Sequence, residues 1–242
     1  MEQLLKDGFA WLGLPLTDTA LKRFRTYYEY LSEQNKVMNL TAIHGEADTA
    51  RLHFLDCAAL LTVQDLKGCS VIDVGSGAGF PGLPLKITEP DMRLTLLDSL
   101  DKRVRFLSDT CALLGLDDVE CIHARAEDAK ALRGQFDAAV SRAVARLNLL
   151  AELCLPFVKV GGVFLAMKGP GAAEELEEAA HAIEVLGGEA EILPYTVPGA
   201  EQAHNVVRIR KRRETPEKYP IRWAKIQKQP LENPPQMRRV FL

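Results

Sequence analysis

The residues with the clearest chemical meaning form a glycine-rich loop, Asp73-Val-Gly75-Ser-Gly77-Ala-Gly79, which follows an apolar run and precedes a predicted helix. Glycines at such a position let the chain turn sharply and let its backbone approach a ligand that a Cβ would block. A dinucleotide fingerprint needs a third glycine where Phe80 stands, and the lysine of a Walker loop is missing. The loop therefore predicts a ligand site, and the neighbouring Asp73 favours a ligand with a cationic amino group.

Two further features follow the next two predicted strands. Asp98 ends the second strand, where a carboxylate can accept hydrogen bonds from both ribose hydroxyls. Ala126 and Glu127 follow the third strand, where a backbone amide or a carboxylate can read an adenine edge. Because the carboxyl ends of parallel strands meet in a crevice at a topological switch point, the three features together predict a nucleoside site.

The elements that position these residues are short apolar runs alternating with amphipathic segments. The predicted strands are 70–75, 93–98, 119–124, 136–141, 162–167, 190–197 and 204–211. Between them, helices are predicted at about 82–88, 101–114, 146–158 and 171–186. This alternation indicates an α/β fold with a doubly wound, mostly parallel seven-stranded sheet. No helix separates the last two runs, so we expect an antiparallel hairpin there.

Three regions are expected to form one structural unit. Residues 1–65 are predicted to be a helical extension or cap, with Thr17 or Asp18 capping a helix that runs to about Glu33. Residues 66–211 hold the α/β domain. Residues 212–242 are rich in proline and lack a helical period, so we expect an extended basic arm.

Composition excludes several classes of protein. Hydrophobic residues at 47% and charged residues at 26% are typical of a globular protein, not of a disordered chain or a disulfide scaffold. The five cysteines and five histidines show no metal-ligand spacing, so we interpret them as packing or surface residues and expect no metal. The start, MEQLLKDGFAWLG, is not a signal peptide, and no apolar run approaches the roughly 20 residues of a membrane helix. We expect a cytoplasmic protein with no membrane partner.

Charge is distributed unevenly along the chain. Residues 205–242 hold 11 Lys and Arg against 3 Asp and Glu, whereas residues 1–204 are acidic overall. A basic tail on an acidic body is typical of a protein with a polyanionic partner, although a solvated tail has the same composition.

The chain also resembles a known family. The stretches that carry the resemblance are NKVMNLTAI (35–43), LHFLDCAAL (52–60), DVGSGAGFPGLPLKI (73–87), SRAVA (141–145), MKGP (167–170) and TPEKYPIR (215–222). They resemble ribosomal RNA small subunit methyltransferase G, also called glucose-inhibited division protein B, within the class I S-adenosylmethionine-dependent methyltransferase fold. The resemblance implies S-adenosylmethionine as cofactor and methyl transfer to N7 of a guanine in the 530 loop of bacterial 16S ribosomal RNA. The partner would be 16S ribosomal RNA or the small ribosomal subunit, and the protein is expected to be a monomer.

The resemblance also implies roles for particular residues. It makes Gly75, Phe80, Asp98, Ser99, Leu100, Ala126, Glu127 and Arg142 expected cofactor-binding residues, beside Asp73, Gly77 and Gly79 of the loop pattern. It also makes Asn39 and Thr41 RNA-binding candidates, whereas Lys168, Arg208, Arg210, Lys211, Arg212 and Arg213 are candidates because of their charge. After YPIR, this chain continues with WAKIQKQPL instead of the family's glycine- and lysine-rich ending, which leaves the C-terminal RNA contacts open.

The chemistry at the end of the fourth strand agrees with attack by a ring nitrogen. Ser141-Arg142-Ala143-Val144 stands where amine methyltransferases of this fold carry an Asp/Asn-Pro-Pro-aromatic motif. Guanine N7 carries no proton, so its methylation needs alignment of the reacting atoms and no general base. We expect Arg142 to position the base by stacking or by bonding O6. The alternative role for Arg142 is an ion pair with a strand-end acid.

Three other functions remain open from the sequence. A methyltransferase of small molecules or proteins is disfavoured by the basic arm. A non-catalytic RNA-binding protein is disfavoured by the intact loop and Asp98, and a dehydrogenase by Phe80.

Overall fold

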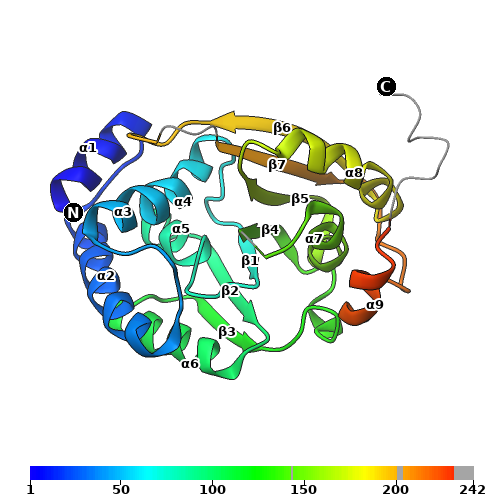
Figure 1. Cartoon of the computed structure of the whole chain (residues 1–242), viewed down its shortest axis with the longest axis horizontal. Helices are drawn as coiled ribbons and strands as arrows, with labels where there is room; N and C mark the ends of the chain where they lie inside the picture. The colour runs from blue at the N-terminus through cyan, green and yellow to red at the C-terminus, as the bar shows by residue number, and fades with distance from the viewer. Residues whose placement is uncertain (143, 201–203, 232–242) are drawn as a thin grey trace.

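The centre of the molecule is a mostly parallel sheet (Figure 1), and the computed structural model describes residues 1–142, 144–200 and 204–231. Its strands are β1 (Ser70–Val74), β2 (Arg93–Asp98), β3 (Val119–His123), β4 (Phe136–Arg142), β5 (Val158–Lys168), β6 (Gly188–Tyr195) and β7 (His204–Lys211). Their order is β3-β2-β1-β4-β5-β7-β6, with β7 antiparallel to both of its neighbours. The seven predicted strands, the doubly wound order and the closing hairpin are confirmed.

Helices cover both faces of this sheet. They are α1 (Glu2–Leu12), α2 (Asp18–Met38), α3 (Glu46–Thr49), α4 (Asp56–Ala58), α5 (Gly82–Thr88), α6 (Asp101–Leu114), α7 (Leu147–Cys154), α8 (Ala172–Val185) and α9 (Trp223–Lys228). A π-helical turn, η1 (Ala50–Leu55), joins α3 to α4, and the short 3-10 turns are η2 (Ala59–Thr62), η3 (Lys130–Leu132) and η4 (Leu155–Phe157). The predicted cap of α2 is confirmed, because the hydroxyl of Thr17 accepts from the Ala20 amide at 3.1 Å. Within the described ranges, no helix combines the length and apolar character that a membrane crossing requires.

Two hydrophobic cores lie on the two faces of the sheet, because successive side chains of a strand point in opposite directions. Val71 of β1 packs into the core formed with α1, α2, α5 and α6, whereas the adjacent Ile72 packs into the core formed with α7, α8 and α9. In Figure 1 the N-terminal helices accordingly gather at one end, and α7 and α8 lie beside β5 and β7. The N-terminal helices share a continuous core with the sheet.

The segment after β7 differs from the prediction of an extended arm without helix. Residues 223–228 form α9, and Ile226 of this helix is buried in the second core. The preceding residues are tied to the domain through their backbone, since the Arg133 guanidinium donates to the Thr215 carbonyl at 2.7 Å and Glu152 accepts from the Ile221 amide at 2.9 Å. A six-residue helix is too short to show a period in the sequence and depends on this packing. Residues 232–242 of the predicted arm lie outside the described residues.

Candidate functional site

The strand order reverses between β1 and its neighbour β4, and a cavity of about 410 Å³ opens at this switch point. We call it the loop cavity. Its lining residues are Leu40, Thr41, His53, Gly75, Ser76, Gly77, Ala78, Phe80, Asp98, Ser99, Arg103, Arg142 and Val144. The structure thus brings six of the predicted cofactor residues together: Gly75, Gly77, Phe80, Asp98, Ser99 and Arg142.

The glycines of the loop serve two purposes. Gly75 has a φ of +76°, and a Cβ on it would lie 2.8 Å from the Val144 Cγ2 atom, so only glycine keeps this wall of the cavity open. Gly79 has a φ of +97° but does not line the cavity, and a Cβ there would lie 2.7 Å from the Tyr27 hydroxyl oxygen. The predicted cofactor contact of Gly79 is therefore corrected: this glycine lets the loop pack closely on helix α2.

Tyr27 of α2 supports the loop from behind. Its buried hydroxyl donates a hydrogen bond to the Ala78 carbonyl. Its ring stacks on Phe80 with 5.6 Å between centroids and on Phe54 with 5.4 Å. The N-terminal helices therefore hold the loop in shape, and they do so through residues that the sequence analysis did not single out.

Asp98 lies at the end of β2 with its carboxylate at the loop cavity. One carboxylate oxygen accepts from the Gly77 amide and the other from the Leu100 amide, both at 2.9 Å. An ionised carboxylate offers about four lone-pair sites, so acceptor capacity remains for hydroxyl donors from a ligand. Leu100 contributes only its backbone amide to this arrangement, because its side chain does not line the cavity.

Asp73 does not contact the cavity, contrary to its predicted role. Its side chain is fully buried, and one oxygen accepts from the Gly82 amide at 2.8 Å, at the start of α5. The other oxygen is buried without a hydrogen-bond partner in the described structure. Burial raises the pKa of this carboxyl to about 7, and the Gly82 hydrogen bond only partly offsets that rise. Asp73 fixes the junction between the loop and α5 instead of meeting a ligand.

Ala126 and Glu127 also lie apart from the loop cavity. They line a small separate pocket together with Tyr219 and Pro220. A carboxylate oxygen of Glu127 accepts from the Trp223 amide at 3.2 Å, which anchors the start of α9. These two residues do not line the loop cavity, and their adenine contact stays a prediction.

Arg142, at the end of β4, is the most constrained charged side chain of the site. Its Nη1 atom donates to the Leu52 carbonyl and to the Asp56 carboxylate, each at 3.0 Å. Its Nη2 atom donates to Nδ1 of His53 at 2.5 Å, and the Phe80 ring centroid lies 4.9 Å from the guanidinium carbon. The ion pair considered in the sequence analysis exists, but its acid is Asp56 of α4, not a strand-end residue.

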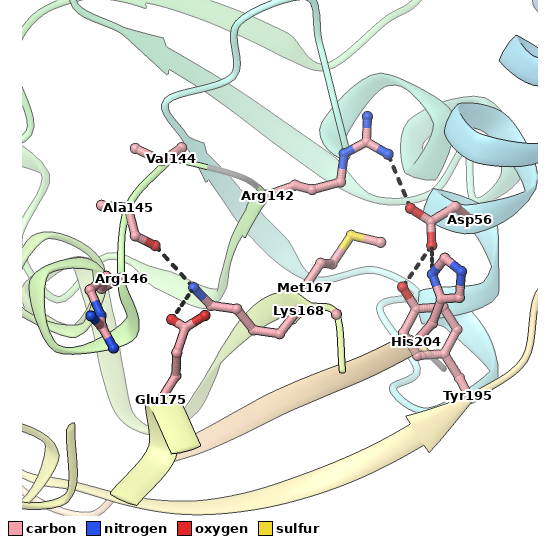
Figure 2. Close-up of a pocket in the computed structure, with 11 residues that line it drawn as sticks. Asp56, Arg142, Val144, Ala145, Arg146, Met167, Lys168, Glu175, Tyr195 and His204 are labelled. Carbon is pink, nitrogen blue, oxygen red and sulfur yellow. Dashed lines mark hydrogen bonds and ion pairs between the residues drawn. The ribbon is translucent and has the colours of Figure 1, made fainter. Parts of the chain in front are cut away.

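Asp56 joins three parts of the chain (Figure 2). The carboxylate oxygen that does not meet Arg142 accepts from the Tyr195 hydroxyl at 2.7 Å and lies 2.9 Å from Nδ1 of His204. Burial would raise the pKa of Asp56, but the His204 hydrogen bond and the Arg142 charge hold that pKa below its usual value. The same hydrogen bond raises the pKa of His204. A buried carboxylate is thus kept ionised by partners from β4, β6 and β7.

His53 is the functional residue that the sequence analysis missed most clearly. Its ring stacks on Phe80 at 4.0 Å, and burial together with the Arg142 charge lowers its pKa to about 3. The neutral ring accepts from Arg142 at Nδ1, so Nε2 donates to the Thr41 hydroxyl at 2.8 Å. The three-residue spacing of His53 and Asp56 was the available signal. Within the described residues, no cluster of His, Cys, Asp or Glu is arranged to hold a metal ion.

A second cavity, of about 500 Å³, lies beyond Arg142, and we call it the hairpin cavity (Figure 2). Its lining residues are Asp56, Arg142, Val144, Ala145, Arg146, Met167, Lys168, Gly169, Glu175, Tyr195 and His204. The Lys168 ammonium donates to the Glu175 carboxylate at 2.7 Å and to the Ala145 carbonyl at 2.9 Å. Arg142 and Val144 line both cavities, so these two side chains form the wall between them.

The basic run on β7 is largely paired within the protein. Arg208 and Arg210 both meet the Glu191 carboxylate, at 2.9 Å and 3.5 Å. Arg212 pairs with Glu189 at 2.6 Å. The charges of these three arginines are therefore partly neutralised within the protein, and their contacts to RNA stay a prediction.

Lys211 corrects the prediction for its own position. Its ammonium is buried and donates to the Leu155 carbonyl at 2.5 Å and to the Thr215 hydroxyl at 2.6 Å. Burial lowers its pKa to about 8. The side chain therefore serves packing and does not reach an external phosphate.

The other RNA candidates differ in their placement. Arg213 donates to the Glu184 carbonyl at the end of α8. Asn39 ends helix α2 with a φ of +51°, whereas Thr41 lines the loop cavity.

Comparisons with known proteins match this chain to one sequence family and to one fold. The family model described as rRNA small subunit methyltransferase G matches residues 20–206. Proteins named ribosomal RNA small subunit methyltransferase G from Alkaliphilus oremlandii and Alkaliphilus metalliredigens are both 46% identical, over 237 and 236 residues, covering 96% of this chain and 99% of each relative. The solved structure of M. jannaschii TYW2 in complex with AdoMet is similar in fold, with a TM-score of 0.51 at 16% identity over 70% of this chain and 79% of that chain.

Proposed function

Because the chain belongs to the rRNA small subunit methyltransferase G family, we propose that it transfers a methyl group from S-adenosylmethionine to N7 of a guanine in the 530 loop of bacterial 16S ribosomal RNA. Its substrate is this RNA, free or within the small ribosomal subunit, and it acts as a cytoplasmic monomer that needs no metal. The observation that carries the proposal is the rigidly held Arg142 between two adjoining cavities.

The residues of the loop cavity fit the cofactor. A side chain at position 75 would narrow the cavity, so the glycine provides room for a ligand against the backbone. Asp98 presents a carboxylate with acceptor capacity for ribose hydroxyls. Phe80 and Ser99 complete the same lining. When bound, the sulfonium supplies an electrophilic methyl carbon to the ring-plane lone pair of N7, and the electrons of the broken bond remain on sulfur.

Arg142 supplies position and charge balance. Its contacts to Leu52, His53 and Asp56 fix the guanidinium, so a base that stacks on it or bonds through O6 is held in one orientation. Holding the reacting atoms in line is the main contribution that such a reaction needs. The methylated base is a cation, and the Asp56 carboxylate compensates the Arg142 charge that would otherwise repel it.

Methyl transfer to small ribosomal subunits from cells lacking the enzyme tests the proposal. Labelled S-adenosylmethionine is supplied, and the RNA is then treated with borohydride and aniline, which cleave at 7-methylguanosine. A single new cut in the 530 loop is expected. Label in RNA without a cut would move the target to another atom, and label only in proteins or small molecules would overturn the RNA substrate.

A further inference from the structure

The hairpin cavity has a carboxylate at each of two polar ends, and only at one end are both carboxylate oxygens occupied by partners within the protein. At the first end, both oxygens of Asp56 are occupied, by Arg142 on one side and by Tyr195 and His204 on the other. At the second end, one oxygen of Glu175, Oε2, accepts from the Lys168 ammonium at 2.7 Å and from the Leu147 amide at 2.9 Å. The other oxygen, Oε1, accepts no hydrogen bond from any residue that the structure describes. The side chain of Glu175 is 26% exposed, so Oε1 is available to a ligand in the cavity.

A carboxylate is an unfavourable group to present to RNA unless it accepts hydrogen bonds. The phosphate backbone is a polyanion, and like charges repel. Three other features of this cavity suit a nucleobase: Arg142 on the shared wall, the Lys168 ammonium beside Glu175, and the apolar side chain of Met167. The Glu175 carboxylate therefore indicates a base that donates hydrogen bonds at this end.

Guanine is the RNA base whose edge matches this pair of charges. Its Watson–Crick edge places two donors, N1–H and the N2 amino group, beside one acceptor, O6. Adenine and cytosine offer one donor next to an acceptor, and uracil places its single donor between two acceptors. A carboxylate accepts from both guanine donors, while an ammonium or guanidinium donates to O6. Enzymes that modify bases extrude the target and read this edge in a pocket.

This binding mode leaves the reacting atom free. In guanine, N7 lies on the edge away from N1 and N2. With the Watson–Crick edge at Glu175, the N7 edge stays available to face the wall formed by Arg142 and Val144, which separates this cavity from the loop cavity. The cavity volume of about 500 Å³ is enough for one base.

We propose that the hairpin cavity is the site of the extruded guanine and that Glu175 selects guanine by accepting from its N1–H and N2 amino groups. This inference rests on the proposed function, because it assigns the substrate base of that same reaction. Glu175 is a specificity-determining residue in this assignment, and Lys168 orients its carboxylate.

The test compares guanosine with inosine, which lacks only the N2 amino group and keeps N1–H, O6 and N7. Small subunits are assembled on 16S ribosomal RNA ligated to carry either nucleoside at the target position, and methyl incorporation is measured with the full-length enzyme, Glu175→Gln and Glu174→Gln. The wild type is expected to lose about 10- to 100-fold in kcat/KM on inosine, the range for one hydrogen bond to a charged group. Glu175→Gln should lose a similar factor on guanosine and discriminate less than about threefold between the two nucleosides. Glu174→Gln, at the exposed neighbouring position, should match the wild type.

Each outcome of this experiment either supports or overturns the role of Glu175. Equal wild-type rates on guanosine and inosine would overturn the role of Glu175, whatever happens to the variant. Full discrimination by Glu175→Gln would overturn it as well. If Glu175→Gln fails to fold, as thermal melting and cofactor binding would reveal, the wild-type comparison still decides. A wild type that methylates neither substrate would overturn the proposed function itself and this inference with it.

Discussion

The two cavities that meet at Arg142 are built in different ways. About half of the residues that line the loop cavity come from two short segments, 75–80 and 98–99, each at the end of a strand. The hairpin cavity is lined by side chains from α4, β4, β5, α8, β6 and β7, which are joined by ion pairs. In the function proposed above, local chain geometry at two strand ends therefore forms the cofactor half of the site, and charged side chains from distant positions form the substrate half.

This difference determines which substitutions should disable each cavity. A cavity whose wall runs along a glycine backbone is sensitive to an added Cβ, as at Gly75. A site made of ion pairs is sensitive to the removal of one partner, because the other is then left buried and unpaired. Substitutions should therefore separate cofactor binding from methyl transfer.

Gly75→Val should have the largest effect and should abolish the loop cavity. Valine is strained at a φ of +76°, and its Cβ already lies within 2.8 Å of Val144. We expect cofactor affinity, measured by titration calorimetry, to fall by about 100-fold or more, which corresponds to about 3 kcal/mol, because the valine side chain occupies space that the ligand needs. Gly134→Val is the control, because Gly134 has a φ of +60° and no neighbour within 4 Å. Unchanged affinity in Gly75→Val would remove the loop from the cofactor site.

Arg142→Lys should break the link between the cavities while leaving the glycines and Asp98 of the loop cavity in place. Lysine keeps the charge but lacks the planar fork that meets Leu52, His53 and Asp56 together. We expect kcat for methyl transfer to fall by about 100-fold or more and the cofactor dissociation constant to change less than about threefold, as for an interaction made mainly in the transition state. Equal losses in both quantities would assign Arg142 to the cofactor instead of the base.

His204→Gln should change the pH dependence of stability, because His204 is paired with Asp56 in the hairpin cavity. The Asp56 hydrogen bond raises the pKa of His204 above its value of 6.5 in the unfolded chain, so its stabilisation is complete below pH 6.5 and is lost as pH rises through the folded-state pKa. Urea unfolding should therefore show a larger stability difference between wild type and variant at pH 6 than at pH 9. Arg142 and Asp56 stay charged across this range, and His53 stays neutral. A difference independent of pH would mean that the imidazolium does not contribute.

Arg212→Ala should have the smallest effect, because this residue lies outside both cavities in an exposed pair with Glu189. Exposed pairs contribute roughly 0–1 kcal/mol, so the free energy of unfolding should change by less than about 1 kcal/mol. The slope of log affinity for small subunits against log salt should fall by less than about one unit, since Glu189 already shares the charge. Arg212→Lys should keep the wild-type slope. A larger fall would show that Arg212, just after β7, supplies a major share of RNA binding.

The sequence predicted the loop cavity well because its signals are local. All seven strands, the glycines at positive φ and the acid that ends β2 follow from residue types and short spacing. Among the predicted acids, Asp73 lies in β1 and Glu127 follows β3, but their carboxylates accept from the backbone amides of Gly82 and Trp223, at the starts of α5 and α9. The sequence pattern shows that a carboxylate lies near a site, but it does not show which hydrogen-bond donor the carboxylate meets.

Most contacts of the hairpin cavity were not predicted, because they join residues that lie far apart in the sequence. His53 and Asp56 reach Arg142 because η1 is a π-helical turn, whose wider winding shifts the side chains that follow it. Tyr195 and His204 join them only when the β6–β7 hairpin is in place. These residues come together through tertiary packing, which neither periodicity nor composition reports.

The support of the glycine loop by Tyr27 has a consequence for biosynthesis. The loop, its covering helices α1 to α6 and strands β1 to β3 all lie within the first 123 residues, and they contribute to one core. Chains leave the ribosome from the N-terminus and begin to fold as they emerge. We therefore expect the proposed cofactor half to take shape on the nascent chain before Arg142 and the hairpin emerge from the ribosome. A chain that has emerged only as far as β3 would expose the uncovered edge of β1, where β4 belongs, so a pause before β4 emerges should increase chaperone association.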